Sequence, residues 1–449
     1  MGKEPIISVR LMVTAPPFEF RLDGTFEGND RVSLFSGKFT VRLDGDRISL
    51  LNENGTVLLT GRTLNLLPKQ AGESFFCIKN VPVGTGFHWE GWHDLTFPGE
   101  FHFRSRDGRK LEVINRLRLE TYLPNVIGSE MSGTAPFEFL KAHSVISRSW
   151  AMREIERKTR EPLARSSTAE PSGEETIIRW TGPEIHNGFD VCADDHCQRY
   201  RGFHEETAVT LERAVQETRG QVLTYGDELC DTRYSKCCGG MTENFSTAWE
   251  DRNIPYLRAV PDSDRTITGF QFPLSEEKNA HAWITGVPQT NCSTRDQELV
   301  ESVLSPLDSE TTDFYRWRVA YSQEEISKII TEKTGRDPGS IRDLIPLERG
   351  ASGRVIRLRI LGTARTFVVG KELEIRRVLS PTHLYSSAFV IRRKPGEGGL
   401  PRAFELLGAG WGHGVGLCQV GAAVMTAGGR TSGEILQHYF PDTILTKVY

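Results

Sequence analysis

Long apolar runs are missing from this chain of 449 residues. Nowhere do about 18 consecutive apolar residues occur, so the sequence predicts no membrane-spanning helix. An excess of charge of one sign is missing too, because 55 Lys and Arg residues are balanced by 59 Asp and Glu residues. Without a basic surplus there is no electrostatic case for nucleic-acid binding. What remains is an ordinary globular composition, 38% hydrophobic and 25% charged, in a chain long enough for two or three substructures.

Cysteine is sparse, and the start of the chain lacks an export signal. The eight cysteines do not form the dense framework of a small disulfide-stapled domain, and five of them fall between residues 192 and 238. This clustering suggests metal or site chemistry and favours a reducing compartment. Residues 1–5 lead directly into a strand-like segment without the basic region and apolar stretch of a signal peptide. Two interpretations stay open: the protein remains inside the cell, or a leader was trimmed.

Short alternating runs dominate the first 118 residues. They are separated by dipeptides that suit hairpin turns: Asp23-Gly24, Asp44-Gly45, Asn54-Gly55 and Asp107-Gly108. Between 119 and 158 the hydrophobic period becomes helical, with a break at 132–135 and Pro136 placed as the first residue of a longer helix. A polar stretch at 159–175 predicts an exposed loop. The sequence therefore predicts an α+β fold, with an N-terminal antiparallel β domain (1–118) before a mixed α/β region.

That mixed region divides into three parts. We assign 119–260 to its first part, 261–400 to an inserted mixed α/β lobe, and 401–449 to its C-terminal part. From about 315 the lobe follows the pattern strand, helix, strand, strand, helix, and Ser322 with Glu325 predicts a capping box at the start of the helix. We expect the lobe to be scaffold.

A glycine-rich segment near the C-terminus is the first candidate site. Residues 410–420 are Gly-Trp-Gly-His-Gly-Val-Gly-Leu-Cys-Gln-Val. Glycine permits positive φ and a close approach of backbone amides to a ligand, while His413 and Gln419 would project into the same space. A tight turn with an incidental histidine explains the same residues, so the loop alone leaves both interpretations open.

A second candidate lies far upstream. Residues 122–131 are Tyr-Leu-Pro-Asn-Val-Ile-Gly-Ser-Glu-Met, and residues 140–151 are Leu-Lys-Ala-His-Ser-Val-Ile-Ser-Arg-Ser-Trp-Ala. Lys141 and Arg148 are seven residues apart and share one helix face. Glu130, at a kink facing two cations, suits acid–base chemistry; a structural ion pair is the alternative.

Together these blocks resemble the stage II sporulation protein D and amidase-enhancer family. The two segments occur in the family's order, and a third block at 234–242, Tyr-Ser-Lys-Cys-Cys-Gly-Gly-Met-Thr, is similar to the family's central pattern. The C-terminal block continues to Ile435-Leu436-Gln437-His438-Tyr439-Phe440-Pro441. The matching blocks cover 119–158, roughly 186–250 and 405–446.

The resemblance implies a peptidoglycan lytic transglycosylase that cleaves the β-1,4 bond between N-acetylmuramic acid and N-acetylglucosamine. The family's catalytic residue corresponds to Glu130. One carboxyl group suffices because the muramyl C6 hydroxyl displaces the leaving sugar internally, whereas ordinary glycosidases use two carboxylates. An acid that starts protonated near neutral pH needs a raised pKa, which nearby cations would oppose. Lys141 and Arg148 are therefore not both expected against Glu130.

The remaining site residues are expected to bind and orient sugar. Hydroxyl, amide and imidazole groups suit the hydroxyl and acetamido groups of a glycan, and Trp411 offers a flat apolar face or serves as a core residue. The expected substrate-binding residues are Lys141, Arg148, Ser149, Tyr234, Trp411, His413 and Gln419. Structural pairing elsewhere on the helix face is the alternative for Lys141 and Arg148.

Two imidazoles and two thiols within twelve residues suggest a metal site. His186, Cys192, His196 and Cys197 have the ligand types and number of a closed tetrahedral zinc site. Members of the resembled family carry a similar arrangement, so we expect a structural zinc ion and no cofactor for the chemistry itself. Free thiols in a turn, or a Cys192–Cys197 disulfide, are the alternatives. Cys237 and Cys238 stay unassigned.

One departure from the family pattern brings a competing enzyme class. Cys418 stands where the family usually has Ser, and a thiol five residues from His413 also suits a cysteine hydrolase with His413 as base. A third interpretation is a non-catalytic peptidoglycan-binding protein that stimulates a partner amidase. The expected partners are peptidoglycan glycan strands and, in that third case, a cell-wall amidase; no nucleic acid is expected. A cell-wall substrate requires a trimmed leader, or else a cytoplasmic role on imported wall fragments.

Overall fold

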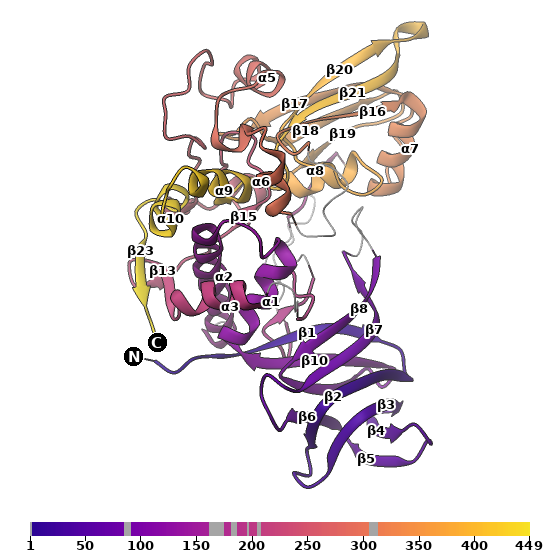
Figure 1. Ribbon diagram of the computed structural model, residues 1–449. Helices are drawn as coiled ribbons and strands as arrows, with labels where there is room; N and C mark the ends of the chain where they lie inside the picture. Colours follow the sequence, from indigo (N-terminus) through magenta and orange to yellow (C-terminus); the bar gives the residue numbers. More distant parts are fainter. Residues whose placement is uncertain are drawn as a thin grey trace.

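The computed structural model describes residues 2–84, 91–160, 175–180, 186–194, 197–203, 208–304 and 313–449. Within these ranges the fold is mixed α+β, as the sequence predicts: a large N-terminal antiparallel sheet, then helices, then smaller sheets further along (Figure 1). Most of the predicted loop at 159–175 lies outside these ranges, and so does His196. None of the helices described is both long enough and apolar enough to pass through a bilayer.

The N-terminal sheet has an aromatic core. Its strands are β1 (Ile6–Thr14), β2 (Phe18–Gly28), β3 (Leu34–Asp44), β4 (Arg47–Asn52), β5 (Val57–Gly61), β6 (Thr63–Pro68), β7 (Phe75–Val83), β8 (Gly91–Pro98), β9 (Glu100–Arg106), β10 (Lys110–Arg118) and β12 (Val191–Cys192). They follow the order β12-β1-β10-β9-β6-β2-β3-β4-β5, with β7 between β2 and β8. Phe76 stacks on Phe20 and Phe101, with ring centroids 4.5 and 3.7 Å apart. Alternation along β2 sends aromatic side chains to this core and polar ones to solvent.

Three of the four predicted hairpin turns are confirmed, and one is wrong. Asp44-Gly45, Asn54-Gly55 and Asp107-Gly108 connect successive antiparallel strands. Asp23-Gly24 instead lies inside β2, where the pairing with β3 shifts register between Leu22 and Phe26. Gly24 has a φ of 84°, a conformation that glycine supplies equally well to a bulge and to a turn.

A bundle of helices joins the sheet to the rest of the molecule. α1 (Leu119–Glu130) begins directly after β10 and ends at the predicted break, and α2 (Phe137–Arg160) begins one residue after Pro136. Pro136 therefore precedes the first helical position rather than occupying it, a difference within the usual uncertainty of helix ends. α2 is buried on most sides because α1, α3 (Ala208–Glu217) and the C-terminal helices all pack against it (Figure 1).

The lobe has a hydrophobic core of its own, which contains Ile326, Leu358 and Ile360. One sheet has the order β11 (Thr176–Ile178), β19 (Thr366–Gly370), β18 (Val355–Gly362) and β17 (Ile341–Arg349). The other has the order β16 (Arg316–Ser322), β21 (Pro401–Ala409) and β20 (Phe389–Pro395). The helices of this region are α5 (Glu277–Thr285), α6 (Gln297–Ser302), α7 (Gln323–Thr334) and α8 (Glu372–Val378). The predicted capping box of Ser322 and Glu325 is present at the start of α7.

The C-terminal segment runs back from the lobe to the helices. β22 (Leu417–Cys418) pairs with β15 (Tyr234–Ser235), and α9 (Gln419–Ala427) and α10 (Ser432–Tyr439) follow. β23 (Ile444–Lys447) then pairs with β13 (Gln221–Tyr225), whose other neighbour is β14 (Glu228–Leu229). The two chain ends meet there, since the Gly2 amide donates to the Val448 carbonyl at 2.9 Å (Figure 1).

Candidate active site and cysteine clusters

Glu130 is the last residue of α1, and three chain segments meet at it. The side chain is largely buried, with 8% of the residue exposed. Its Oε1 accepts hydrogen bonds from the Tyr234 hydroxyl at 2.9 Å and from the Arg199 amide at 3.2 Å. The carbonyl of a helix-terminal residue has no partner within the helix; that of Glu130 accepts from Lys236 Nζ at 3.0 Å. These contacts fix both the carboxylate and its backbone.

The second carboxylate oxygen of Glu130 has different surroundings. Over the described ranges, Oε2 has no hydrogen-bond partner, and it is not among the fully enclosed polar atoms. One oxygen is thus anchored while the other remains available. An anchored carboxyl group with one available oxygen can give a proton to a bound molecule or take one from it without losing its position.

Residues 197–203 form the support behind Glu130. The Arg199 amide binds the Glu130 carboxylate, and the Arg201 amide donates to Ser129 Oγ at 2.9 Å. Alternate amides of one extended segment therefore hold two consecutive side chains at the end of α1. Cys197 begins this segment.

A polar chain leads from Tyr234 to the C-terminal segment. Tyr234 packs against the His143 ring, with centroids 4.6 Å apart, and the Gln419 amide lies 3.2 Å from His143 Nε2. Because the amide nitrogen only donates, His143 Nε2 accepts, and Nδ1–H then donates to Ser147 Oγ at 3.1 Å. Burial, helped by the Lys236 cation, lowers the pKa of His143 to about 3. Burial and the Glu130 carboxylate raise the pKa of Tyr234 well above its usual range.

His143 is a site residue that sequence reasoning missed. It lies on α2 between Lys141 and Arg148, and its only signal was a histidine within a block that matched the family. A buried histidine whose two ring nitrogens both have protein partners acts as a positioning group, because neither nitrogen is left for substrate.

Lys141, Arg148 and Ser149 make their contacts with residues other than Glu130. Lys141 pairs with Glu138 at 2.8 Å and with Glu217 at 3.6 Å. Arg148 is fully buried and binds both oxygens of Glu120 at 2.9 Å each. Ser149, also fully buried, accepts from the Leu223 amide and donates to the Val145 carbonyl. These side chains join α2 to its neighbours, which for Lys141 and Arg148 is the structural pairing given as the alternative; their contact with substrate stays a prediction.

The glycine-rich loop approaches protein rather than open space. Gly410, Gly412, Gly414 and Gly416 all have positive φ, between 73° and 91°. A Cβ on Gly416 would lie 2.1 Å from the Arg233 carbonyl, and one on Gly414 would lie 2.4 Å from the Arg354 guanidinium. The glycines therefore let this loop pack against residues 233–238 and Arg354. The close approach predicted from the sequence is present, but its partner is the protein itself.

Trp411, His413 and Gln419 of this loop also contact the protein. His413 Nδ1 accepts from the Val415 amide at 3.0 Å, and its ring packs against Trp249. Burial and the nearby Arg233 and Arg354 cations lower the pKa of His413 to about 3. Trp411 is 7% exposed and packs against Phe314 and Tyr385. Gln419, at 1% exposure, is part of the chain to His143.

Three of the four expected zinc ligands lie together. Candidate ligand atoms of His186, Cys192 and Cys197 are within 4.8 Å of one another, and His186 Nε2 is 3.2 Å from Cys197 Sγ. The fourth, His196, lies outside the described residues. No disulfide joins Cys192 to Cys197, so that alternative is wrong. One nitrogen and two sulfur donors in a largely buried loop fit a zinc ion.

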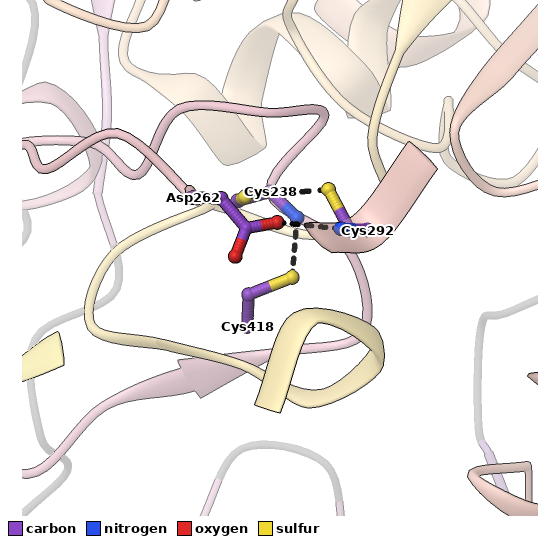
Figure 2. A group of neighbouring side chains, drawn as sticks. All are labelled: Cys238, Asp262, Cys292 and Cys418. Atoms are coloured by element: carbon purple, nitrogen blue, oxygen red, sulfur yellow. Dashed lines mark hydrogen bonds between the residues drawn. The ribbon is translucent and has the colours of Figure 1, made fainter. Parts of the chain in front are cut away.

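A second cluster was not predicted. Cys238, Asp262, Cys292 and Cys418 are buried together, and their candidate ligand atoms also lie within 4.8 Å of one another (Figure 2). This group could hold a metal ion. Sequence spacing could not reveal it, because its members come from separate segments between residues 238 and 418; the unassigned Cys237-Cys238 pair and the unusual Cys418 were the available signals.

With this geometry in place, comparison with known proteins identifies part of the chain. A profile described as stage II sporulation protein matches residues 107–225, which include α1, α2 and the His186 cluster. The chain carries a SpoIID domain. Residues 243–416 match a second profile, described as a domain of unknown function (DUF8618). This second match spans the lobe and most of the glycine-rich loop.

The chain is distantly homologous to two proteins of Bacillus subtilis (strain 168). It is 22% identical to the amidase enhancer over 333 residues, which are 72% of this chain and 40% of that protein. It is 22% identical to stage II sporulation protein D over 338 residues, 75% of this chain and 76% of that protein. An uncharacterized protein of Brachyspira hyodysenteriae is 24% identical over 328 residues, which are 73% of this chain and 66% of that protein. The match thus spans only 40% of the length of the amidase enhancer.

Proposed function

We propose that the protein is a peptidoglycan lytic transglycosylase in which Glu130 acts first as acid and then as base. The SpoIID domain belongs to a cell-wall-associated family that includes lytic transglycosylases. The observation that carries the proposal is the arrangement of Glu130, whose Oε1 is anchored by Tyr234 and Arg199 while Oε2 lacks a partner within the described part of the chain.

The proposed reaction needs one carboxyl group. Glu130 gives its proton to the glycosidic oxygen between N-acetylmuramic acid and N-acetylglucosamine, and the bond from muramyl C1 to that oxygen breaks. The muramyl C6 hydroxyl attacks C1, and Glu130 takes up the hydroxyl proton. The products are a free N-acetylglucosamine hydroxyl and a 1,6-anhydro-muramyl end, so no water is consumed. General acid and base catalysis by one positioned group contributes typically 10²–10⁴-fold to a rate.

Tyr234 is the proposed orienting residue. Its hydroxyl donates to Glu130 Oε1 at 2.9 Å. Because the pKa of Tyr234 is raised well above its usual range, the hydroxyl stays protonated near neutral pH and remains a donor. The ring in turn rests on His143, which Gln419 and Ser147 hold. Through Gln419 the glycine-rich segment contributes to catalysis by positioning Tyr234.

We also propose that His186, Cys192 and Cys197 hold a structural zinc ion, with His196 as the fourth ligand. Bound zinc would tie the ends of the 192–197 loop together and take no part in bond cleavage. The loop leads directly into the segment whose Arg199 and Arg201 amides hold α1. Removal of zinc is therefore expected to release the support of Glu130.

Mass spectrometry of purified glycan strands tests the catalytic proposal. Wild-type protein should generate 1,6-anhydro-muramyl ends, and the Glu130→Gln variant should not. Gln keeps an oxygen that accepts from Tyr234 and Arg199, so the variant is expected to fold. Equal anhydro ends with both proteins, or none with either, would refute the proposal.

A non-catalytic amidase enhancer is the second candidate, because one relative carries that name. It predicts no anhydro ends with either protein, together with faster cleavage of stem peptides by an added cell-wall amidase. A cysteine hydrolase receives no geometric support. Cys418 is fully buried, and no hydrogen bond joins it to His413 among the residues described. Iodoacetamide should leave the activity of the folded protein largely intact.

A further inference from the structure

We propose that Cys238, Asp262, Cys292 and Cys418 form a second structural zinc site, separate from the His186 cluster. The four residues are 0–2% exposed, and their side chains lie together (Figure 2). Cys238 follows β15, Asp262 lies on the bridged segment beside Met241, Cys292 is on a short 3₁₀ turn (Asn291–Ser293), and Cys418 precedes α9. Three thiolates and a carboxylate are a closed donor set of the kind that suits Zn²⁺.

The spacing of the sulfur atoms suits a metal rather than a disulfide. Cys238 Sγ and Cys292 Sγ are 3.7 Å apart. Two thiolates on a tetrahedral zinc ion, each about 2.3 Å from the metal, stand about 3.8 Å from each other. A disulfide requires about 2.05 Å between the two sulfur atoms, and no disulfide joins Cys238 to Cys292. The Cys238 and Cys292 sulfur atoms therefore already have the separation that two thiolate ligands of one zinc ion would have.

Backbone and side-chain donors already point at the ligand atoms. Cys418 Sγ accepts from the Cys238 amide at 3.2 Å and from the Gly421 amide, in the first turn of α9, at 3.4 Å. Asp262 accepts from the Cys292 amide at 2.8 Å and from the Tyr439 hydroxyl at 2.6 Å. Amides at a helix start stabilise a thiolate, and partners of this kind orient metal ligands.

Asp262 has no cationic partner among the residues that the structure describes. The carboxylate is fully buried, and no Lys, Arg or His forms an ion pair with it in the described ranges. A buried carboxylate beside thiols and without a positive partner is costly. Zn²⁺ supplies that partner. Cys237 adjoins Cys292 and Cys418, yet it falls outside the group whose ligand atoms all lie close together.

A zinc ion here would clip together segments that position the active site. Cys418 lies between Leu417, which pairs with Tyr234, and Gln419, which binds His143. Cys238 lies at the other end of the segment that carries Tyr234 and Lys236. The site therefore links loops from the lobe side to the 234–238 segment, which holds Glu130, and to the 417–419 segment, which holds His143.

Zinc content per chain tests the proposal without any activity assay. The full chain, purified with a reductant and incubated with Zn²⁺, is measured by elemental analysis and native mass spectrometry. A Cys192→Ser/Cys197→Ser background removes the first cluster and should keep one zinc per chain. Adding Cys238→Ser/Cys292→Ser should remove that last zinc. Adding Cys230→Ser instead should not, and Cys230 is a matched control because it is a fully buried free cysteine elsewhere.

A milder variant covers the case in which the double replacement unfolds the protein. Asp262→Asn on the same background should bind zinc at least about tenfold more weakly in competition with a chelating dye. Cobalt in place of zinc should give the thiolate-to-metal charge-transfer absorption of a sulfur-rich site. The proposal is overturned by a background variant that binds no zinc, by iron in place of zinc, by a Cys238–Cys292 disulfide, or by unchanged zinc affinity in Asp262→Asn.

Discussion

The end of α1 and the glycine-rich loop carry the two strongest sequence motifs, yet the two segments contact the rest of the protein in different ways. At the end of α1, Glu130 keeps one carboxylate oxygen without a protein partner in the described ranges. In the loop, His413 Nδ1 binds the Val415 amide and the glycines pack against the 233–238 segment and Arg354. Dense glycine thus indicates where the chain packs closely against itself. The buried carboxylate at the end of α1, with one oxygen still available, is where we propose that the chemistry takes place.

We expect the largest effect from replacing Glu130, at the end of α1. Glu130→Gln should lower the rate of anhydro-end formation by about 10²–10⁴, the usual contribution of general acid–base catalysis. Its melting temperature should stay close to that of the wild type, because the amide oxygen still accepts from Tyr234 and Arg199. Rates come from chromatography of glycan digests, and calorimetry provides the control. A large loss of stability would instead make Glu130 a structural residue.

We expect the next largest effect from a replacement in the glycine-rich loop. Gly416 has a φ of 73°, and a Cβ there would lie 2.1 Å from the Arg233 carbonyl. Gly416→Ala should lower the free energy of unfolding by about 1–3 kcal/mol for the strained backbone alone, and by more because of the clash. Gly429→Ala is the matched control, since φ is 88° but no atom lies within 4 Å of its Cβ position. Urea unfolding that ranks the two variants equally would contradict the packing role.

We expect a smaller effect from replacing Tyr234, which lies between the end of α1 and the glycine-rich loop. Tyr234→Phe removes the hydroxyl that holds Glu130 Oε1 at 2.9 Å. A hydrogen bond to a charged group contributes about 1.5–3 kcal/mol, so the rate should fall about 10- to 100-fold. We expect the loss in kcat rather than KM, because Tyr234 acts on the catalytic group. Tyr225→Phe, on an exposed tyrosine, should leave the rate unchanged.

Sequence reasoning succeeded where the signal is local. The β-to-α change at 118–119, the break before α2 and the capping box of α7 all depend on residues a few positions apart. The same holds for His186, Cys192 and Cys197, which lie within twelve residues and do gather in space.

It failed where distant segments decide the outcome. Cys238, Asp262, Cys292 and Cys418 meet only after the lobe and β22 have docked, so no spacing rule could group them. The burial of Arg148 was equally hidden, since its partner Glu120 lies on the preceding helix and its carbonyl acceptors lie near β13. Asp23-Gly24 satisfies the sequence requirements of a turn, and only the pairing of β2 with β3 makes it a bulge.

We expect the smallest effect from replacing His143, which lies between Tyr234 and Gln419. Burial holds its folded-state pKa at about 3, whereas the unfolded value is near 6.5. Below pH 6.5 the unfolded chain therefore binds a proton that the folded protein excludes. Above pH 6.5 the neutral His143 therefore costs no stability. As pH falls from 6.5 toward 3, the free energy of unfolding decreases by at most about 1.4 kcal/mol per pH unit. His143→Gln keeps an acceptor for Gln419 and should flatten the dependence of unfolding free energy on pH between 6 and 4.5. The exposed His281→Gln should not, and parallel curves for all three proteins would show that His143 is not held neutral.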